Sequence, residues 1–415
     1  MASEAPVKVL HVITRMVRGG AARIVLALCD GLRRRRFDVL LAAGGEAGPE
    51  GSLWDEAEAL GIPSVRLPAL IRRIAPSRDL AALAALRALC RARRPDIVHA
   101  HTSKAGLIGC LAARMEGVPA VVLAPHGHIL APGARIPGVP NRGLMRRLLA
   151  AAARRSARHA DLVIAPNEHE REDGIRHGAW TEERSTVVPN GVDTDLFRPR
   201  DRGAARAAIG LPRAGFVLGV AARLTPEKGI DYAIEALTCV PGAVLVIAGD
   251  GPERARLAVL AQSLGVAGRV MFAGLRARME EILPAFDTFL APSRTEAHGM
   301  AAAEALACGV PVIAFAVGGL RSIVLGGVTG LLAAPGDVES FAAAARLLAA
   351  DPALRARLGR AGREHVCARF SLNAMLAQTV AVYTALLRRK GREPDGVDRG
   401  DVSRESGRVR TASRQ

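Results

Sequence analysis

Short apolar runs alternate with amphipathic segments along most of the chain. The runs are rich in Val, Ile, Leu and Ala and are usually bounded by Gly, Pro or Asp. Such runs indicate strands that are buried on both faces of a parallel sheet, and the segments between them have the apolar spacing of helices. The pattern predicts strands at residues 7–13, 37–42, 64–67, 96–100, 120–124, 161–165, 185–188, 216–221, 243–248, 270–273, 287–291 and 312–315.

The alternation stops once and then restarts, which divides the chain. Residues 190–199 hold an Asn-Gly turn and a Phe-Arg-Pro segment, as a linker would. We therefore predict an α/β protein with two doubly wound domains, residues 1–198 and 199–370, that face each other across a cleft. An amphipathic helix at residues 371–390 is expected to return to the N-terminal domain. Residues 391–415 are polar and carry charges of both signs, so we expect them to be disordered.

The stretch at residues 293–311, SRTEAHGMAAAEALACGVP, follows the predicted strand at 287–291. Glu296 then lies in the loop at the strand's carboxyl end, and Glu304 lies inside the helix predicted at residues 300–308. A carboxylate on an alanine-rich helix is costly to bury unless it meets a hydrogen-bond donor. Because open α/β sheets bind ligands at this edge, the stretch indicates a site for a phosphorylated, hydroxyl-rich ligand. The alternative is a surface loop with two solvated glutamates.

Basic and glycine residues follow other predicted strands of the second domain. Arg223 and Lys228 lie in one short loop, ARLTPEKG, from which both side chains can reach a diphosphate. Gly249 lies in GDGP, a tight turn from strand to helix. A solvated basic pair is the alternative interpretation. No GxSxG, HExxH or Walker lysine loop is present in the sequence.

Two His-x-His pairs, His99/His101 and His126/His128, stand at the ends of successive predicted strands. Side chains at positions i and i+2 of a strand share a face, so a zinc-dependent hydrolase is a rival interpretation. No acidic cluster and no third pair accompany them in the sequence. We therefore predict no metal site and no metal requirement.

Composition excludes some function classes. Aromatic residues make up only 3% of the chain, which argues against a stacking platform for single-stranded nucleic acid, and we expect no nucleic-acid partner. The six cysteines form no CxxC pair, which fits a reducing cytoplasm. No apolar run approaches the roughly 18 residues of a membrane span, and the N-terminus does not read as a signal peptide.

The formal net charge of +17 is unevenly distributed. Residues 60–158 hold 17 Lys or Arg and three acidic residues. The segment 142–158 reads as a basic amphipathic helix, which is typical of contact with an anionic membrane surface, although a solvated face is the alternative. We expect a cytoplasmic protein that is peripheral on the inner face of the cell membrane. The candidate contact residues are Arg142, Arg146, Arg147, Arg154 and Arg155.

Taken together, these residues resemble a large family of retaining nucleotide-sugar glycosyltransferases with the GT-B fold, the E-x7-E or family 4-like group. Glu296 and Glu304 have the E-x7-E spacing. Further matches occur in the same order as in the family: Gly19-Gly20, HTSKAGLIG at 101–109, HGH at 126–128, VPNGVD at 188–193, Arg223 with Lys228-Gly229, GDGP, and VGG followed by TGLL within 317–332. The set is most similar to the capsule, exopolysaccharide and lipid-linked-oligosaccharide branch.

The resemblance implies two Rossmann-like domains, with the acceptor bound by the N-terminal one and the nucleotide sugar by the C-terminal one. It implies a UDP- or GDP-sugar donor, a lipid-linked or saccharide acceptor, and no cofactor. Glu304 would bind the donor ribose, and Glu296 with the backbone around His298, Gly299 and Met300 would hold the donor sugar. His298 replaces the family's usual aromatic residue, which leaves the identity of that sugar open. The sequence also departs from the family at Ser322, where the GGxxE segment has an acid, and at Ala22, where a glutamate often follows the first glycine pair. A nucleotide-sugar 2-epimerase of the same architecture is the alternative.

The resemblance also implies how the reacting groups are arranged. Arg223 and Lys228 would neutralise the leaving diphosphate, aided by N–H groups at Gly19 and Gly20. His126 would lie beside the anomeric carbon. In retaining members the acceptor hydroxyl is thought to attack from the side of the leaving group, so no dedicated nucleophile is required.

Overall fold

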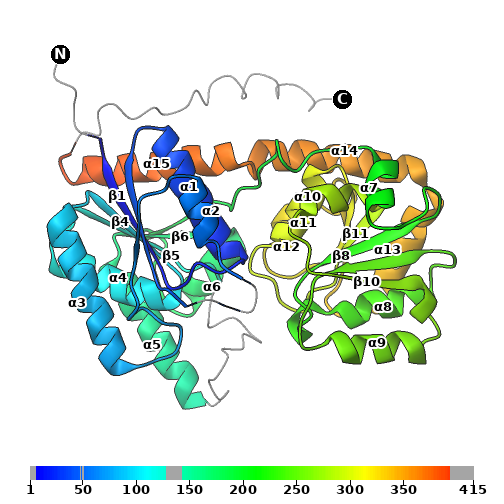
Figure 1. The fold of residues 1–415 in the computed structure, drawn as a ribbon, viewed down its shortest axis with the longest axis horizontal. Helices are drawn as coiled ribbons and strands as arrows, with labels where there is room; N and C mark the ends of the chain where they lie inside the picture. The colour runs from blue at the N-terminus through cyan, green and yellow to red at the C-terminus, as the bar shows by residue number, and fades with distance from the viewer. Residues whose placement is uncertain (1–5, 47, 49–50, 128–142, 393–415) are drawn as a thin grey trace. The chain divides into compact units, whose positions relative to one another are not determined.

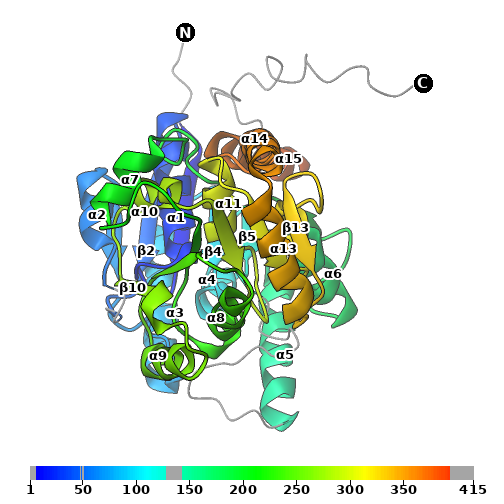
Figure 2. The same ribbon diagram turned by 90° about the vertical axis from the view of Figure 1, so that its right-hand side faces the viewer.

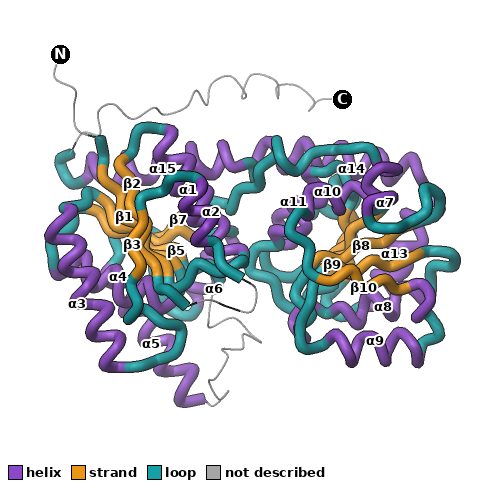
Figure 3. Tube along the Cα trace, viewed as in Figure 1, coloured by secondary structure: helices purple, strands orange, loops and turns teal. Residues whose placement is uncertain are grey.

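The computed structural model describes residues 6–46, 48, 51–127 and 143–392, with the backbone alone at residues 143–150. These residues fold into two units. The first comprises the described parts of residues 1–166, 171–188 and 373–392, and the second comprises residues 167–170 and 189–372. Each unit has a parallel sheet covered by helices, as the strands and helices of Figure 3 show.

The first unit contains a seven-stranded sheet in the order β3-β2-β1-β4-β5-β6-β7. Every pair of neighbouring strands is parallel, and β1, β4 and β5 are almost entirely buried, as expected for strands covered on both faces. The strands are β1 (Lys8–Ile13), β2 (Asp38–Ala43), β3 (Ser64–Arg66), β4 (Ile97–His101), β5 (Ala120–Ala124), β6 (Leu162–Ala165) and β7 (Ser185–Val187).

Helices connect these strands, and the last helix of the chain joins them (Figure 1). They are α1 (Gly20–Arg34), α2 (Trp54–Ala59), α3 (Pro76–Arg93), α4 (Ser103–Met115), α5 (Gly143–His159), α6 (Glu168–Arg176) and α15 (Leu372–Arg389). Tyr383 of α15 is fully buried against Phe37 and His99, and Leu376 packs where Gly31 of α1 has no side chain. The helix therefore contributes to the core of the first unit.

The second unit contains a six-stranded parallel sheet in the order β10-β9-β8-β11-β12-β13. Alternate residues of each strand supply two cores, one on each face: Leu218 and Leu245 pack in one, and Val217 and Val246 in the other. The strands are β8 (Val217–Ala221), β9 (Val244–Ala248), β10 (Val270–Gly274), β11 (Thr288–Ala291), β12 (Val312–Phe315) and β13 (Gly330–Ala333).

The helices of the second unit cover both faces of its sheet. They are α7 (Arg202–Ala208), α8 (Ile230–Thr238), α9 (Arg254–Ser263), α10 (Met279–Ile282), α11 (Met300–Ala307), α12 (Leu320–Ile323), α13 (Val338–Ala350) and α14 (Pro352–Arg369). Figure 2 shows α13 beside β13, and α13 also contacts α8.

Two features differ from the sequence prediction. Strand β13 occupies a segment in which helices were predicted. Its Leu331, Leu332 and Ala333 suit either a helix or a strand, and the pairing with β12 makes the segment a strand. Residues 189–198 belong to the second unit, since Val192 donates and accepts backbone hydrogen bonds with Phe370 and Leu372 and Phe197 joins the second core. The predicted disordered tail lies outside the described residues except for Gly391 and Arg392.

Candidate functional site

The strand order of the second sheet reverses between β8 and β11, which are neighbours although β9 and β10 lie between them in the chain. The loops after these two strands, residues 222–229 and 292–299, therefore emerge at the same place on the carboxyl edge. Open α/β sheets bind ligands at this point because the two loops diverge there and leave a crevice. The predicted donor-binding residues of these two loops stand at that edge.

The two loops are joined by an ion pair. The ammonium group of Lys228 lies 2.7 Å from Oε2 of Glu296, and both side chains are mostly buried, with 23% and 17% of their surface exposed. The hydroxyl of buried Ser293 donates to the same oxygen at 3.1 Å. The structure therefore places two predicted site residues in direct contact and fixes their orientation.

Glycines let the loop backbones approach closely. Gly229 has φ 60°, and a Cβ there would lie 2.1 Å from the carbonyl oxygen of Pro292. After β12, Gly318 has φ 46°, and a Cβ there would lie 1.7 Å from the carbonyl oxygen of Glu296. Because no other residue fits at these two positions without moving the neighbouring loop, the glycines hold Lys228 and Glu296 in place.

The other predicted donor residues lie around this pair. The Arg223 side chain is 57% exposed and lies 3.9 Å from the carboxylate of Glu227. Gly249 is buried after β9, next to the backbone of Ala222. Gly299 has φ 95° and caps α11, whose first residue is Met300 and on which Glu304 is partly buried. His298 is 4% exposed and packs edge-on against Phe370, with ring centroids 6.1 Å apart.

In the first sheet the strand order reverses between β1 and β4. The hydroxyls of Thr14 and Thr102, which follow these strands, are 3.0 Å apart. Thr102 and His126 have φ angles of 68° and 51°, a region that β-branched and most other side chains avoid. Backbone strain of this kind persists where the surrounding structure enforces it, often at functional sites. His126 is partly buried after β5, and Gly19 and Gly20 begin α1.

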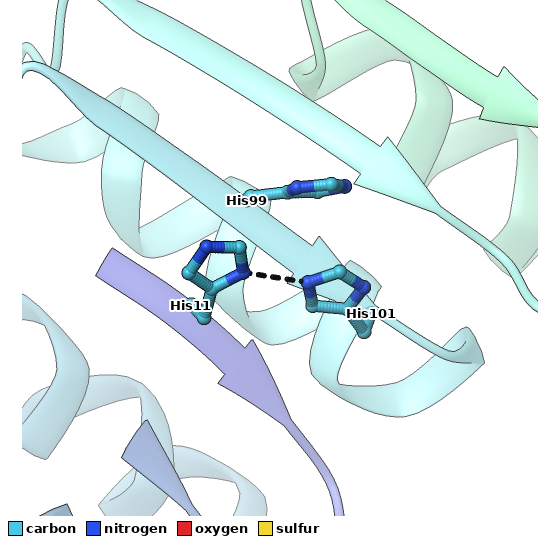
Figure 4. Close-up of side chains that lie close together, drawn as sticks. All are labelled: His11, His99 and His101. Carbon is cyan, nitrogen blue, oxygen red and sulfur yellow. Dashed lines mark hydrogen bonds between the residues drawn. The ribbon is translucent and has the colours of Figure 1, made fainter. Parts of the chain in front are cut away.

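Behind this edge, the structure brings together histidines that the sequence does not connect. His11 of β1 and His99 and His101 of β4 are buried, and one nitrogen from each lies within 4.8 Å of the others. Figure 4 shows the three side chains close together, with a dashed line between His11 and His101. Burial lowers the pKa of His11 to about 3 and holds the pKa values of His99 and His101 well below the usual range, so the imidazoles are neutral.

The neutral rings are hydrogen-bonded to one another and to a tyrosine. His11 Nδ1 lies 2.9 Å from His101 Nε2, and His99 Nδ1 lies 2.7 Å from the Tyr383 hydroxyl. Among the described residues, no carboxylate or thiol joins the three histidines. His128 of the second His-x-His pair lies outside the described residues. His11 was not among the predicted site residues. The sequence marks it only as a polar residue inside an otherwise apolar strand.

The candidate membrane residues are described only in part. Arg154 and Arg155 of α5 are exposed, while Ser156 and Ala157 between them and the helix end are buried, so the helix is amphipathic there. Arg146 and Arg147 lie in α5, but their side chains, like the whole of Arg142, are outside the described residues. No helix in the described part of the chain has the length and apolar character needed to cross a membrane.

Two protein families match successive parts of the chain. Residues 18–196 match the family described as Glycosyltransferase Family 4, and residues 201–365 match Glycosyl transferases group 1. The first match ends and the second begins around the end of the segment that the sequence predicted to be a linker, residues 190–199.

Characterised relatives agree with these families. The chain is 36% identical over 317 residues to D-inositol 3-phosphate glycosyltransferase of Mycobacterium avium, a match that spans 73% of this chain and 72% of the relative. It is 30% identical over 344 residues to an Escherichia coli UDP-Gal:alpha-D-GlcNAc-diphosphoundecaprenol alpha-1,3-galactosyltransferase, spanning 81% of this chain and 86% of the relative.

Solved structures share the fold. The crystal structure of Anabaena HepE in complex with UDP has a TM-score of 0.78 at 25% identity and covers 91% of this chain and 100% of its own. HepE in complex with UDP-glucose gives a TM-score of 0.77 at the same identity, covering 91% of this chain and 99% of its own. WaaG, a glycosyltransferase of lipopolysaccharide biosynthesis, has a TM-score of 0.71 at 18% identity, covers 91% of this chain and 99% of its own, and shows the fold alone.

Proposed function

The chain belongs to the family 4-like glycosyltransferases with the GT-B fold, and we propose that it transfers a sugar from a UDP- or GDP-sugar with retention of the anomeric configuration. The observation that carries this proposal is the contact of Lys228 with Glu296 at the point where the second sheet reverses. The similarity to a UDP-glucose complex and to a UDP-galactose-dependent enzyme favours UDP as the nucleotide.

The proposed chemistry needs charge stabilisation more than a nucleophile. The bond between the anomeric carbon and the phosphate oxygen breaks, the acceptor oxygen bonds to that carbon, and its proton passes to the leaving diphosphate. Negative charge develops on the diphosphate, where Lys228, Arg223 and the amides of Gly19 and Gly20 are proposed to bind. A fixed cation or donor of this kind contributes about 10²–10³ in rate, and we propose that these groups make a metal unnecessary.

The remaining residues are proposed to recognise the donor. Glu304 would accept hydrogen bonds from the ribose hydroxyls, and Glu296 from the hydroxyls of the transferred sugar, with His126 beside the anomeric carbon. Gly249 and the backbone from His298 to Met300 would complete the binding surface. The Escherichia coli relative's diphosphoundecaprenol acceptor supports a lipid-linked acceptor for this chain, with a saccharide acceptor as the other possibility.

Ligand binding provides the first test. We expect UDP-sugars to raise the thermal unfolding temperature in the presence of a chelator, because a ligand that binds only the folded state stabilises it. GDP- and ADP-sugars serve as the comparison. Product analysis then distinguishes transfer from the alternatives. Free nucleotide with a new glycosidic bond supports the proposal, whereas an isomerised nucleotide sugar without acceptor indicates an epimerase, and a zinc-dependent hydrolysis would contradict both.

A further inference from the structure

Arg294 connects the loop after β11 to the chain on both sides of Lys228. Its backbone N–H donates to the carbonyl oxygen of Glu227 at 2.9 Å, and its guanidinium donates to the carbonyl oxygen of Pro226 at 2.8 Å. The same guanidinium donates to both carboxylate oxygens of Asp231, at 2.9 and 2.7 Å. Lys228 therefore lies between two segments that are each bound to Arg294.

The contact of Arg294 with Asp231 is stronger than an ordinary surface ion pair, which contributes little because water competes for both charges. It is bidentate, which fixes the plane of the guanidinium. The Asp231 side chain is only 14% exposed. The guanidinium carbon also lies 4.2 Å from the centre of the Tyr232 ring, close enough for a cation–π interaction. Tyr232 in turn packs edge-on against Phe315 of β12, so Arg294 rests on the core of the second unit.

Asp231 is a firmly placed partner for Arg294. It lies in the first turn of α8, where the partial positive charge of the helix N-terminus favours a carboxylate. Burial raises the pKa of Asp231, but the hydrogen bonds from Arg294 and the charges of Arg294 and Arg256 outweigh burial and hold the pKa below its usual range. Asp231 is therefore ionised at neutral pH and keeps its bidentate contact.

These bonds act on the ion pair of the candidate site. Glu296 follows Arg294 by two residues, and Lys228 precedes Asp231 by three. The backbone segments that carry Lys228 and Glu296 can therefore separate only if the bonds of Arg294 break. Because both terminal nitrogens of the guanidinium are already bound to Asp231, Arg294 would influence a ligand through Lys228 and not by direct contact.

We propose that Arg294 is a positioning residue that holds the ammonium group of Lys228 where the leaving diphosphate binds. This inference rests on the proposed function, in which Lys228 neutralises that diphosphate. A displaced lysine on a long, flexible side chain still reaches a bound diphosphate. The charge that develops during bond breaking, however, is stabilised best by a cation that is fixed in advance. The loss of Arg294 should therefore appear in kcat more than in the donor KM.

The position of Lys228 can be followed without any substrate. The chain contains four lysines, so in protein labelled with ¹⁵N-lysine the Nζ resonance of Lys228 is the one that disappears in Lys228→Ala. We expect Arg294→Ala to shift this resonance and to speed its hydrogen exchange with water, because the ion pair with Glu296 loosens. Arg294→Lys should have a smaller effect of the same kind, since an ammonium group keeps the charge but lacks the fork that binds both oxygens of Asp231.

Arg256→Ala is the matched control. Arg256 lies on α9 with a terminal nitrogen 3.7 Å from the same carboxylate of Asp231, and its side chain is 51% exposed. Its removal takes a positive charge away from Asp231 but leaves the hydrogen bonds of Arg294 in place. The Lys228 resonance and kcat should therefore both stay as in the unaltered protein.

Kinetics in two backgrounds supply the second measurement. We expect Arg294→Ala to lower kcat by about 10-fold, less than the roughly 10²–10³-fold loss on removing a stabilising group itself. In the Lys228→Ala background the same substitution should change kcat by only about two-fold, because the residue through which Arg294 acts is gone. Arg294→Lys should recover part of the loss. Asp231→Asn keeps the shape of that side chain without its charge, and it repeats the test if Arg294→Ala does not fold.

Three results would overturn the inference. One is a Lys228 resonance that is the same with and without the Arg294 side chain. Another is full kcat in Arg294→Ala when Lys228→Ala is impaired. The third is an equal loss of kcat on removing Arg294 with Lys228 present or absent, which would indicate a general structural role. If the resonance shifts as expected but Lys228→Ala transfers sugar normally, the role of Lys228 in the proposed function fails instead.

Discussion

Lys228 and Glu296 place opposite charges 2.7 Å apart in a position that is mostly shielded from water. A carboxylate this close to an ammonium group orients it but also competes with a phosphate for it. The hydroxyl of Ser293 also donates a hydrogen bond to Glu296 Oε2. The carboxylate would therefore keep a hydrogen-bond partner if Lys228 bound another anion. The pair thus suits a site where a diphosphate binds and leaves in each cycle.

Replacing Lys228 by Ala is expected to lower kcat by about 10²–10³-fold, because under the proposed function the charge on the leaving diphosphate loses a fixed cation. The donor KM should rise as well, since Glu296 remains as an uncompensated negative charge. Adding Glu296→Gln should recover part of the donor affinity but not kcat, so the two effects will not add. Steady-state kinetics of the four combinations measure this. Arg276→Ala, an exposed cation beyond β10 of the same sheet, is the control, and undiminished kcat in Lys228→Ala would contradict the assignment.

The buried histidines make stability depend on pH. Burial lowers the folded-state pKa of His11 to about 3 from its ordinary value of 6.5. Below pH 6.5 the unfolded chain therefore binds more protons than the folded one, and the free energy of unfolding should fall as the pH decreases from 6.5 toward 3. Each such histidine contributes up to about 1.4 kcal/mol per pH unit. Denaturant unfolding at several pH values measures the slope.

His11→Asn should make this slope shallower, and His169→Asn, at an exposed position, should leave it unchanged. An identical slope in His11→Asn would show that His11 gains protons in the folded state as easily as in the unfolded one.

At the scale of elements, the site depends on how closely neighbouring loops approach. Gly229 carries a left-handed φ of 60° and lies where a Cβ would be 2.1 Å from the Pro292 carbonyl oxygen. Gly242 also has a left-handed φ, 73°, but a Cβ there would meet nothing within 4 Å. The two positions separate the cost of the backbone conformation from the cost of the contact between loops.

Gly242→Ala should therefore lower the free energy of unfolding by only about 1–2 kcal/mol, the cost of placing a residue other than glycine in the left-handed conformation. Gly229→Ala should lose a further 1–3 kcal/mol through overpacking and should also reduce transfer activity, because the loop after β8 moves away from the loop after β11. Chemical denaturation and donor kinetics on both variants test this. Equal losses of stability, with full activity in Gly229→Ala, would show that the contact does not hold the site.

These elements also show what a sequence can predict. Twelve strands and most helices follow from apolar periodicity and from Gly and Pro at their ends, and the boundaries differ by only one or two residues at β1, β4 and β11. Strand β13 is not predictable in this way, since its GLLA segment becomes a strand only through pairing with β12. The positions of the residues after β8 and β11 at the carboxyl edge are predictable, because these residues follow recognisable strands of a parallel sheet. The cluster of His11 with His101 is not, since it depends on the register of β1 against β4.

At the scale of the whole molecule, the basic residues and the E-x7-E stretch lie in different units. Residues 60–158, with 17 Lys or Arg and three acidic residues, all belong to the first unit, and the E-x7-E stretch belongs to the second. A glycosyltransferase that acts on a lipid-linked acceptor must meet it at a membrane. We therefore propose that the exposed arginines of α5 bind anionic lipid headgroups, while the second unit binds the soluble donor.

Vesicle co-sedimentation tests this division. Binding should require anionic lipid and weaken as salt increases, because each exposed Arg near an anionic surface contributes about 1 kcal/mol and the attraction is screened. Arg154→Glu with Arg155→Glu should lower the fraction bound at least 10-fold. The matched control is Arg357→Glu with Arg360→Glu, which makes the same change of charge at exposed positions of α14 in the second unit and should leave binding unchanged. Equal pelleting with neutral and anionic vesicles, or equal losses in the two double variants, would mean that α5 is a solvated face and that the acceptor is reached without it.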